Sequence, residues 1–333
     1  MATNLFATYG TIEFLQRSNH PTFINIVARE HSSLLAVPIT GTCKNFEKLT
    51  NKSKNRFLDT PCWDSSRVVL HDTKDGSDYI NANYVSGFNL SKKFIATEHP
   101  MESTLNNFWT MVWEQEVRVI VMLGAMEESH PNNTYYFPYN QDNTIFSDFI
   151  VWEEKKINSK HYYIETLLSI THKETGESRA VHHFKYLDWP ENNIPKVDNF
   201  LEFLLLVNNK YHDFFNPLQL GSIVVHGNAG IGRTATFCAV DTCLHQLVYT
   251  ATISIPSVVL KIRQQRNSSI PALIQYIFIN RVLYYFMVDI RSNFTAFLQI
   301  DSQIVPNDVD LLTHSLQKLV LPINLMNLDI KET

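Results

Sequence analysis

The chain has few cysteines and no long apolar run. Its four cysteines are scattered over 333 residues and form no C-x-x-C pair: Cys43, Cys62, Cys238 and Cys243. This pattern argues against a disulfide framework or a cysteine-based metal site and predicts reduced thiols. No segment reaches the roughly eighteen apolar residues that a transmembrane helix needs, and the first residues do not read as a secretory signal. We therefore expect a cytoplasmic protein without a membrane span.

The chain also lacks an excess of positive charge. Lys and Arg number 28 against 33 Asp and Glu, for a net charge of −5. This balance argues against nucleic acid or an anionic membrane as a partner, so a bound anion would need a local site. The thirteen histidines include the pair His182 and His183, but no second ligand cluster accompanies them at helical or hairpin spacing. We predict no metal and no cofactor, and we interpret His183 as a structural residue.

The rest of the composition is that of a folded domain. Hydrophobic residues make up 44% of the chain, and there is no internal repeat or Pro/Gly/Ser-rich linker. Periodicity predicts helices within 11–37, 106–116 and 233–248, and strands at 68–70, 84–85, 93–96, 117–123 and 222–226. We predict one α/β domain, with a central mixed twisted sheet flanked by helices. It would comprise a helical segment at 1–50, the main domain at 51–296 and an extension at 297–333, whose residues 311–325 could be a docking helix or a partner-binding element. The sequence makes no prediction of oligomeric state.

One short segment has the pattern of a phosphate site. The apolar strand at 222–226 leads into the loop G-N-A-G-I-G-R-T at 227–234, and a helix follows. Gly230 and Gly232 allow the backbone to approach a ligand, and the Arg233 guanidinium matches two phosphate oxygens. A helix N-terminus at the same point favours an anion. His226, just before the loop, is expected to order loop carbonyls rather than to act as a base.

Six motifs in one order give the chain a family resemblance. The loop at 226–234 resembles the signature of the cysteine-dependent protein tyrosine phosphatases, His-Cys-x-x-Gly-x-x-Arg-Ser/Thr. The other motifs are similar to family segments as well: Lys54–Asp59, Asp78–Ala82, Phe94–Pro100, Phe108–Trp113, and His183–Phe184 ahead of Trp189-Pro190-Glu191. The helix from Thr234 and the segment from Ser254 also look like the phosphatase-like proteins of bracoviruses of parasitoid wasps.

The resemblance implies a fold and a set of site residues. It implies the tyrosine phosphatase fold and a phosphate-binding loop formed by Gly227, Asn228, Ala229, Gly230, Ile231, Gly232, Arg233 and Thr234. It implies phosphotyrosine recognition by Phe57, Asp59 and Gln275, with Phe57 either facing a substrate ring or packing in the core. Phosphotyrosine is favoured over phosphoserine, whose shorter side chain would not reach the loop.

Several positions depart from the family pattern. Gly227 stands where the family has its nucleophilic cysteine, and without a nucleophile no phosphocysteine intermediate can form. Glu191 replaces the aspartate that acts as general acid, and its extra methylene misplaces the carboxyl. Pro271 replaces the glutamine that would position the hydrolytic water, although Gln275 keeps the second glutamine. The segment 127–137 also lacks the Lys-Cys pair that usually follows its acidic residue.

These departures favour a protein that binds phosphotyrosine but does not hydrolyse it. The sequence predicts a catalytically inactive tyrosine phosphatase-like protein that binds phosphotyrosine-containing host proteins and shields or sequesters them, interfering with host cell signalling. One alternative is an interaction scaffold with a vestigial phosphate pocket. Another is residual hydrolysis by a rearranged route.

Overall fold

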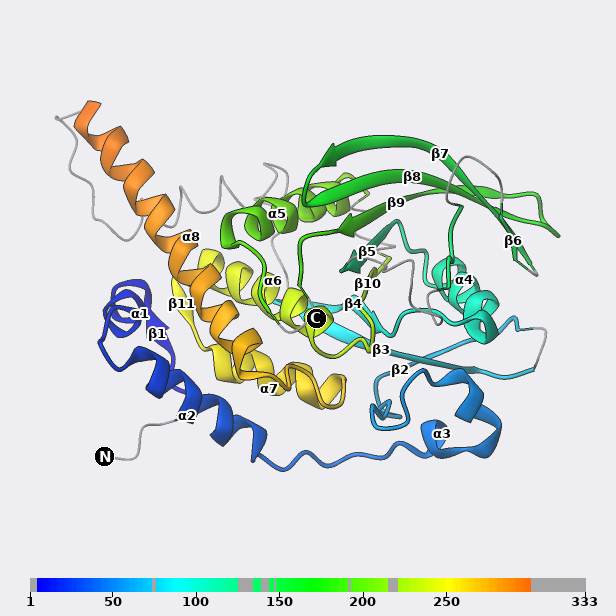
Figure 1. Cartoon of the computed structure of the whole chain (residues 1–333), viewed down its shortest axis with the longest axis horizontal. Helices are drawn as coiled ribbons and strands as arrows, with labels where there is room; N and C mark the ends of the chain where they lie inside the picture. Colours follow the sequence, from blue (N-terminus) through cyan, green and yellow to red (C-terminus); the bar gives the residue numbers. More distant parts are fainter. Residues whose placement is uncertain are drawn as a thin grey trace, which may run out of the picture.

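The computed structural model describes residues 5–73, 76–124, 134–138, 144–146, 148–190, 193–214 and 221–300, with only the backbone of 144, 145 and 290–300. A nine-stranded mixed sheet runs through the protein in the order β2-β3-β4-β10-β5-β9-β8-β7-β6 (Figure 1). Its strands are β2 (Arg67–Val69), β3 (Tyr79–Gly87), β4 (Leu90–Thr97), β5 (Val119–Leu123), β6 (Thr144–Phe146), β7 (Phe149–Lys160), β8 (Tyr163–His172), β9 (Ser178–Tyr186) and β10 (Ile223–His226). A two-stranded sheet joins β1 (Tyr9–Gly10) to β11 (Thr252–Ile253).

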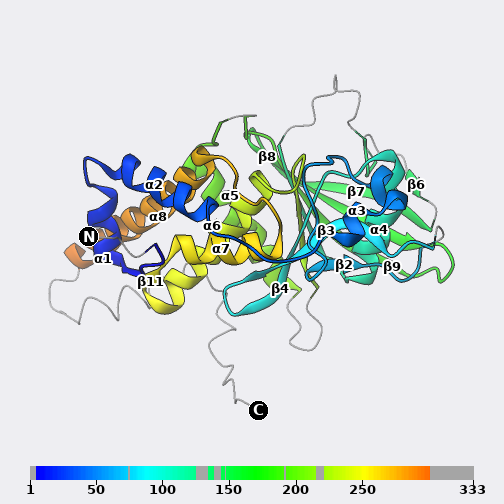
Figure 2. The same cartoon turned by 90° about the horizontal axis from the view of Figure 1, so that it is seen from below.

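Helices cover both faces of the large sheet. They are α1 (Thr11–Ser18), α2 (Phe23–Leu35), α3 (Lys44–Glu47), α4 (Leu105–Glu114), α5 (Val197–Asp213), α6 (Arg233–Thr250), α7 (Ile255–Gln265) and α8 (Leu273–Ile300), with short 3-10 turns at Leu49–Lys54 and Glu102–Thr104. Helices α5 to α8 gather on one face, and α4 lies on the other (Figure 1). Turned by 90°, α1 and α2 lie beside α8 at the end of the molecule away from β6 and β7 (Figure 2).

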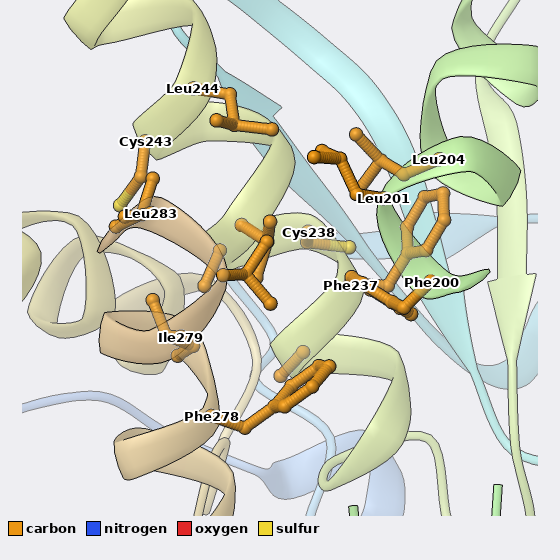
Figure 3. Close-up of a cluster of buried hydrophobic side chains, with 14 of the residues drawn as sticks. Phe200, Leu201, Leu204, Phe237, Cys238, Cys243, Leu244, Phe278, Ile279 and Leu283 are labelled. Carbon is orange, nitrogen blue, oxygen red and sulfur yellow. The ribbon is translucent and has the colours of Figure 1, made fainter. Parts of the chain in front are cut away.

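The central strands are buried on both faces because their side chains alternate between two cores. On β10, Ile223 and Val225 join the core under α5, α6 and α8, whereas Val224 joins the core under α4. All five residues of β5 are buried. Such continuous apolar runs are typical of strands covered by helices on both sides. Figure 3 shows the larger core, where Phe237 of α6 lies among side chains of α5 and α8.

Helix α6 is buried on nearly all sides. Fourteen of its eighteen residues are buried, between the sheet and helices α7 and α8. Within this core, Lys93 Nζ of β4 pairs with Asp241 Oδ2 of α6 at 2.7 Å, and Asn208 of α5 bonds to both partners. A buried ion pair needs such additional hydrogen bonds to offset the loss of hydration. The pair therefore joins one strand and two helices behind the loop at 227–234.

The predicted fold class is confirmed, and the predicted elements occur with small shifts. The helical segment 11–37 is two helices, separated at 19–22, where Pro21 interrupts the pattern. The strand expected at 117–123 begins at Val119. The docking helix predicted at 311–325 lies outside the described residues.

Candidate functional site

The loop at 227–234 lies where several parallel strands end. Strand β10 pairs in parallel with β4 and β5, so that His226 is opposite Thr97 on one side and Met122 on the other. Strand β9 continues the parallel set beyond β5. The carboxyl edge of a parallel sheet is where ligands of α/β proteins commonly bind. The loop leaves β10 at this edge and enters α6 at Arg233.

The peptide groups of the loop are held from outside. The Asn228 carbonyl accepts a hydrogen bond from the His99 amide at 3.0 Å, and the Ile231 carbonyl accepts one from the Ile270 amide at 2.9 Å. Arg266 donates to the two carbonyls between them, those of Ala229 and Gly230, both at 3.2 Å.

This pattern orients the loop amides. In a trans peptide the N–H and C=O groups point in opposite directions, so the N–H groups of residues 229–232 are turned away from these outer donors. Successive amides that face one point form an anion-binding concavity, and the N-terminus of α6 adds to it. The outward carbonyls therefore agree with the predicted phosphate-binding loop.

Two glycines of the loop lie in close contact with neighbouring segments. Gly230 has φ +68°, and a β-carbon there would lie 2.3 Å from the Thr97 carbonyl oxygen. A β-carbon at Gly232 would lie 2.6 Å from Gln275 Nε2. A side chain at Gly230 would meet the backbone of β4 and move the loop away from it, whereas a side chain at Gly232 would displace the end of the Gln275 side chain. Gln275, one of the predicted recognition residues, thus lies directly against the loop.

A third glycine makes room for the guanidinium of Arg233. Gly124 follows β5 with φ +115°, and a β-carbon there would lie 2.3 Å from Arg233 Nη1. Arg233 Nη1 also donates to the Leu123 carbonyl at 3.5 Å. The end of β5 therefore positions the arginine beside the loop.

Gly227 differs from the other glycines because nothing excludes a side chain there. A β-carbon would lie 3.5 Å from both the Leu123 carbonyl oxygen and Thr234 Oγ1, and 3.7 Å from Arg233 Cβ. These are ordinary van der Waals distances, and the backbone at Gly227 does not have the left-handed φ that favours glycine. The backbone at position 227 could therefore carry a β-carbon, although the residue there is glycine.

The predicted phosphotyrosine-recognition segment is tied to the same loop. Arg56 Nε donates to the His99 carbonyl at 3.1 Å, and the His99 amide donates in turn to Asn228. Phe57 is half-buried, whereas Asp59 is exposed. Phe57 is therefore neither fully buried nor fully exposed.

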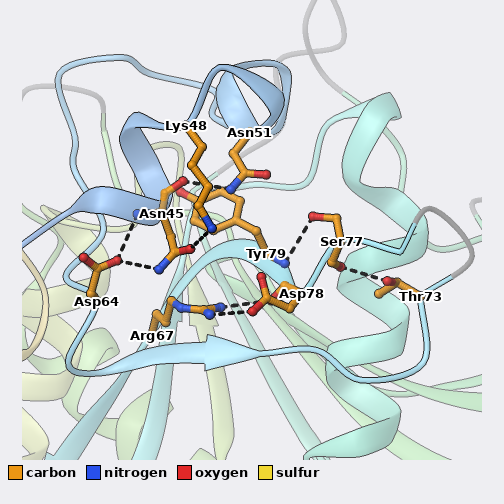
Figure 4. Close-up of polar contacts among 9 residues, drawn as sticks. All are labelled: Asn45, Lys48, Asn51, Asp64, Arg67, Thr73, Ser77, Asp78 and Tyr79. Atoms are coloured by element: carbon orange, nitrogen blue, oxygen red, sulfur yellow. Dashed lines mark hydrogen bonds and ion pairs between the residues drawn. The ribbon is translucent and has the colours of Figure 1, made fainter.

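Polar contacts support this segment from below. Asn55 Oδ1 accepts hydrogen bonds from Tyr79 Oη at 2.7 Å and Asn81 Nδ2 at 3.1 Å. Figure 4 shows Tyr79 beside a second group, in which Asn45 donates to Asp64 and accepts from Lys48. These bonds hold Asn55 against β3 and Asn45 against Asp64, and so position the chain that carries Phe57.

Of the two other positions that depart from the family pattern, the structure describes Pro271 but not Glu191. Glu191 lies outside the described residues, as does most of the segment 127–137. Trp189, just before it, is buried against Phe200 and Phe278, and its indole N–H donates to the Asn193 carbonyl at 3.1 Å. Pro271 is exposed and directly follows Ile270, whose amide holds the loop.

Histidines cluster beneath the loop around one tyrosine. The Tyr136 hydroxyl lies 2.6 Å from His183 Nε2 and 2.7 Å from His226 Nε2. Burial lowers the pKa of His183 to about 3 and that of His226 well below its usual value, so both rings are neutral. The prediction that His183 is structural is confirmed. His226 bonds to this tyrosine and also interacts with the backbone of Gly227, the first residue of the loop.

Glu98 is a buried carboxyl next to the loop. Its Oε1 accepts a hydrogen bond from the Arg56 amide at 2.8 Å, and burial raises its pKa to about 7. Its own amide is 2.8 Å from the position of a β-carbon at Gly230. Glu98 therefore connects the recognition segment to the signature loop.

Sequence analysis missed Arg266, Glu98 and Tyr136. Arg266 directly follows α7 in a polar stretch typical of a surface, yet it is fully buried. Glu98 and His99 stand where the family segment has Gln and Gly, and this difference was the one signal in the sequence that could have identified them. Tyr136 carries no local pattern that distinguishes it from other aromatics.

The described helices include none that is long and apolar enough to cross a bilayer. Likewise, within the described ranges no three His, Cys, Asp or Glu side chains gather in a way that could hold a metal ion.

Comparison with known proteins agrees with this geometry. The family model described as protein-tyrosine phosphatase matches residues 51–285. The chain belongs to the protein tyrosine phosphatase family. Among its relatives is probable tyrosine phosphatase protein N1 of Microplitis demolitor bracovirus, 39% identical over 81% of this chain and 87% of the relative. Tyrosine phosphatase-like protein J1 of the same virus is 36% identical over 76% of this chain and 87% of its own.

A solved structure shows the same fold. The chain resembles PTPN18 in complex with HER2-pY1196 phosphopeptides, with a TM-score of 0.75, 27% identity, and coverage of 83% of this chain and 98% of that one. The protein is thus a tyrosine phosphatase-family domain with viral relatives.

Proposed function

We propose that this protein is a catalytically inactive member of its family that binds phosphotyrosine-containing host proteins and shields or sequesters them in the host cytoplasm. The observation that carries the proposal is Gly227. It lies at the end of β10 in a loop whose glycines, outward carbonyls and Arg233 are otherwise in place. Chemistry that needs a thiolate has no nucleophile there.

Loss of the thiolate leaves the binding groups intact. The backbone donors and Arg233 do not depend on the side chain at position 227. A thiolate about 4 Å from a phosphate dianion would repel each unit of charge by about 1 kcal/mol in water and about 4 kcal/mol at an effective dielectric of 20. Glycine removes this repulsion, at a cost in loop ordering of about 0.5–1 kcal/mol. The balance favours retained binding.

The recognition segment supports phosphotyrosine as the ligand. Phe57 is partly exposed on a segment that is tied to the loop through Arg56 and His99. An aromatic side chain at that place can stack on a phenyl ring. The solved relative PTPN18 was captured with phosphotyrosine peptides.

The test is calorimetric titration of a phosphotyrosine peptide pool into the natural protein and into Arg233→Ala. We expect binding by the natural protein and a loss of at least about tenfold in Arg233→Ala, since a charge-assisted bidentate contact is removed. Arg281→Ala, on the exposed side of α8, is the matched control. Equal binding by natural protein and Arg233→Ala, or none by a folded natural protein, would support the vestigial-pocket scaffold instead.

Turnover is tested separately with an aryl phosphate. The natural protein is expected to release no phosphate above the rate of a heat-denatured sample. Hydrolysis that is lost in Arg233→Ala would overturn the inactive assignment and point to a rearranged catalytic route.

A further inference from the structure

Strand β7 has a long stretch with a neighbouring strand on one side only. The strand pairs with β8 from end to end, whereas β6 pairs with its first three residues, Phe149–Val151. Because β6 is the last strand of the sheet, no described segment pairs with residues 152–160 on that side (Figure 1). Such an edge presents unpaired N–H and C=O groups, which can bond to a strand of another chain.

The side chains at the start of this edge are open to solvent and to a partner. Trp152 is 44% exposed and Ile157 is 38% exposed. The residues between them are two acids followed by two bases: Glu153, Glu154, Lys155 and Lys156. None of these four makes an ion pair within the described part of the chain. The segment 152–157 therefore carries both apolar surface and charges that the chain itself does not pair.

The order of these side chains is complementary to its own reverse. Two copies of the segment can run antiparallel, with the two-fold axis between Glu154 and Lys155. Trp152 of one copy then lies opposite Ile157 of the other. The acids lie opposite the bases, Glu153 with Lys156 and Glu154 with Lys155, and each pairing occurs twice because a two-fold interface is isologous. Opposite charges and apolar pairs that face each other across antiparallel strands stabilise the pairing.

The same charges disfavour other arrangements. In a parallel pair in register, each glutamate would face a glutamate and each lysine a lysine, which is destabilising. Lysines on an edge strand also keep unrelated strands away, because pairing would remove water from their charge. Register shifts against β8 within Glu153–Lys155 and Lys156–Asn158 bend the strand and limit a straight pairing to a short segment. An antiparallel copy, by contrast, supplies a carboxylate to each lysine.

We propose that residues 152–157 of β7 form a self-complementary edge through which two copies of this chain pair antiparallel in solution. The contact continues the sheet of one copy into that of the other. Six residues from each copy make a small interface, so the dimer is weak and forms at high protein concentration. The inference is independent of the proposed phosphate binding, because β5, β9 and β8 separate β7 from the strand that leads into the loop at 227–234.

Sedimentation velocity tests the pairing on the full chain, from about 5 to about 500 µM, the range expected of a small, transient interface. We expect the natural chain to pass from monomer to dimer within this range. Lys155→Glu/Lys156→Glu makes all four charges negative, and Glu153→Lys/Glu154→Lys makes all four positive. Each double variant should dimerise at least about tenfold more weakly, because attractive pairs become repulsive.

An equimolar mixture of the two double variants is the sharpest sample. Every charge of one chain then faces the opposite charge of the other, so we expect a mixed dimer at least as tight as the natural one. The matched control is Lys196→Glu/Lys261→Glu, which makes the same change in net charge at exposed positions outside the large sheet. It should dimerise as the natural chain does.

Three results would overturn the proposal. A natural chain that stays monomeric at the highest concentration has no such interface. A natural dimer that persists in both double variants forms through another surface. Two folded double variants that are monomeric alone and also in the mixture do not pair through these charges, and thermal unfolding establishes that both are folded. None of these results bears on the phosphotyrosine proposal, which the titration of Arg233→Ala tests separately.

Discussion

The guanidinium of Arg266 donates to the Gly230 carbonyl oxygen at 3.2 Å, although the two residues are separated by 36 positions. The same group donates to Asn81 Oδ1 at 2.6 Å and Asn83 Oδ1 at 2.9 Å, both on β3. One buried arginine therefore joins the end of α7, a strand of the sheet and the outer side of the loop at 227–234.

Arg266→Met should lower both stability and phosphate binding. The variant keeps an unbranched apolar stem but leaves two buried amide oxygens and two loop carbonyls without their donor. We expect a loss of about 3 kcal/mol in the free energy of unfolding in urea. Arg281→Met, on the exposed surface of α8, is the control and should change it by less than about 0.5 kcal/mol. Similar stability for the two variants would show that the hydrogen bonds donated by Arg266 do not stabilise the fold.

Glu98→Gln should change how stability depends on pH. Burial raises the pKa of Glu98 from 4.5 to about 7. Between these two pH values the folded protein therefore keeps a proton that the unfolded chain releases. Stability from this residue is complete below pH 4.5 and is lost as the pH rises to 7. We expect Glu98→Gln to be more stable than the natural protein at pH 8 by about 3 kcal/mol, with the difference gone near pH 4.5. Thermal unfolding across this range measures it.

The control for Glu98→Gln is Glu177→Gln, in an exposed turn. It removes the same charge from the surface and measures the general effect of net charge. Parallel stability curves for Glu98→Gln and the natural protein would contradict the buried, protonated carboxyl.

Gly230→Ala should be far more damaging than the same change at Gly176. Both glycines have left-handed φ, +68° and +71°, but a β-carbon at Gly176 meets nothing within 4 Å. The strain common to both is about 1 kcal/mol, and the clash with Thr97 adds about 2 kcal/mol at Gly230 alone. Urea unfolding should thus separate the variants, and only Gly230→Ala should lose phenyl phosphate binding. Equal costs would mean that the loop moves away from β4 without penalty.

Gly227→Cys should fold and become reactive without becoming an efficient phosphatase. Its β-carbon has ordinary contacts, so stability should change by less than about 1 kcal/mol. Loop amides and the α6 N-terminus lower a thiol pKa, which predicts rapid alkylation by iodoacetate at pH 6.5. The natural protein, with its four cysteines, is the control for background labelling. Turnover should remain low because Pro271 offers no amide to position water, and turnover at a typical enzyme rate would contradict that reading.

The fold and the position of the loop could be predicted because their signals are local. Apolar runs such as Val119–Leu123 indicate strands covered on both sides, and this strand is buried throughout. The glycines, Arg233 and the following helix are contiguous, so one short motif identified the loop.

The support of the loop could not be predicted because it joins residues distant in sequence. Arg266 bonds to Asn81 across 185 positions, and Tyr136 bonds to His226 across 90. Neither pairing leaves a periodicity or a motif. Burial of an arginine or a glutamate depends on what the fold places around it, and the sequence at Arg266 or Glu98 does not encode that locally.

The enclosure of β10 and α6 predicts where amide hydrogens exchange most slowly. Strand β10 is bonded on both sides, and α6 is covered by the sheet, α7 and α8. Their amides should therefore exchange only when the whole domain opens. The loop at 227–234 connects β10 to α6. Both ends of the loop therefore stay in place during any local fluctuation that does not unfold the whole domain. The anion site that we propose would therefore stay preformed for as long as the domain stays folded, whatever residue stands at position 227.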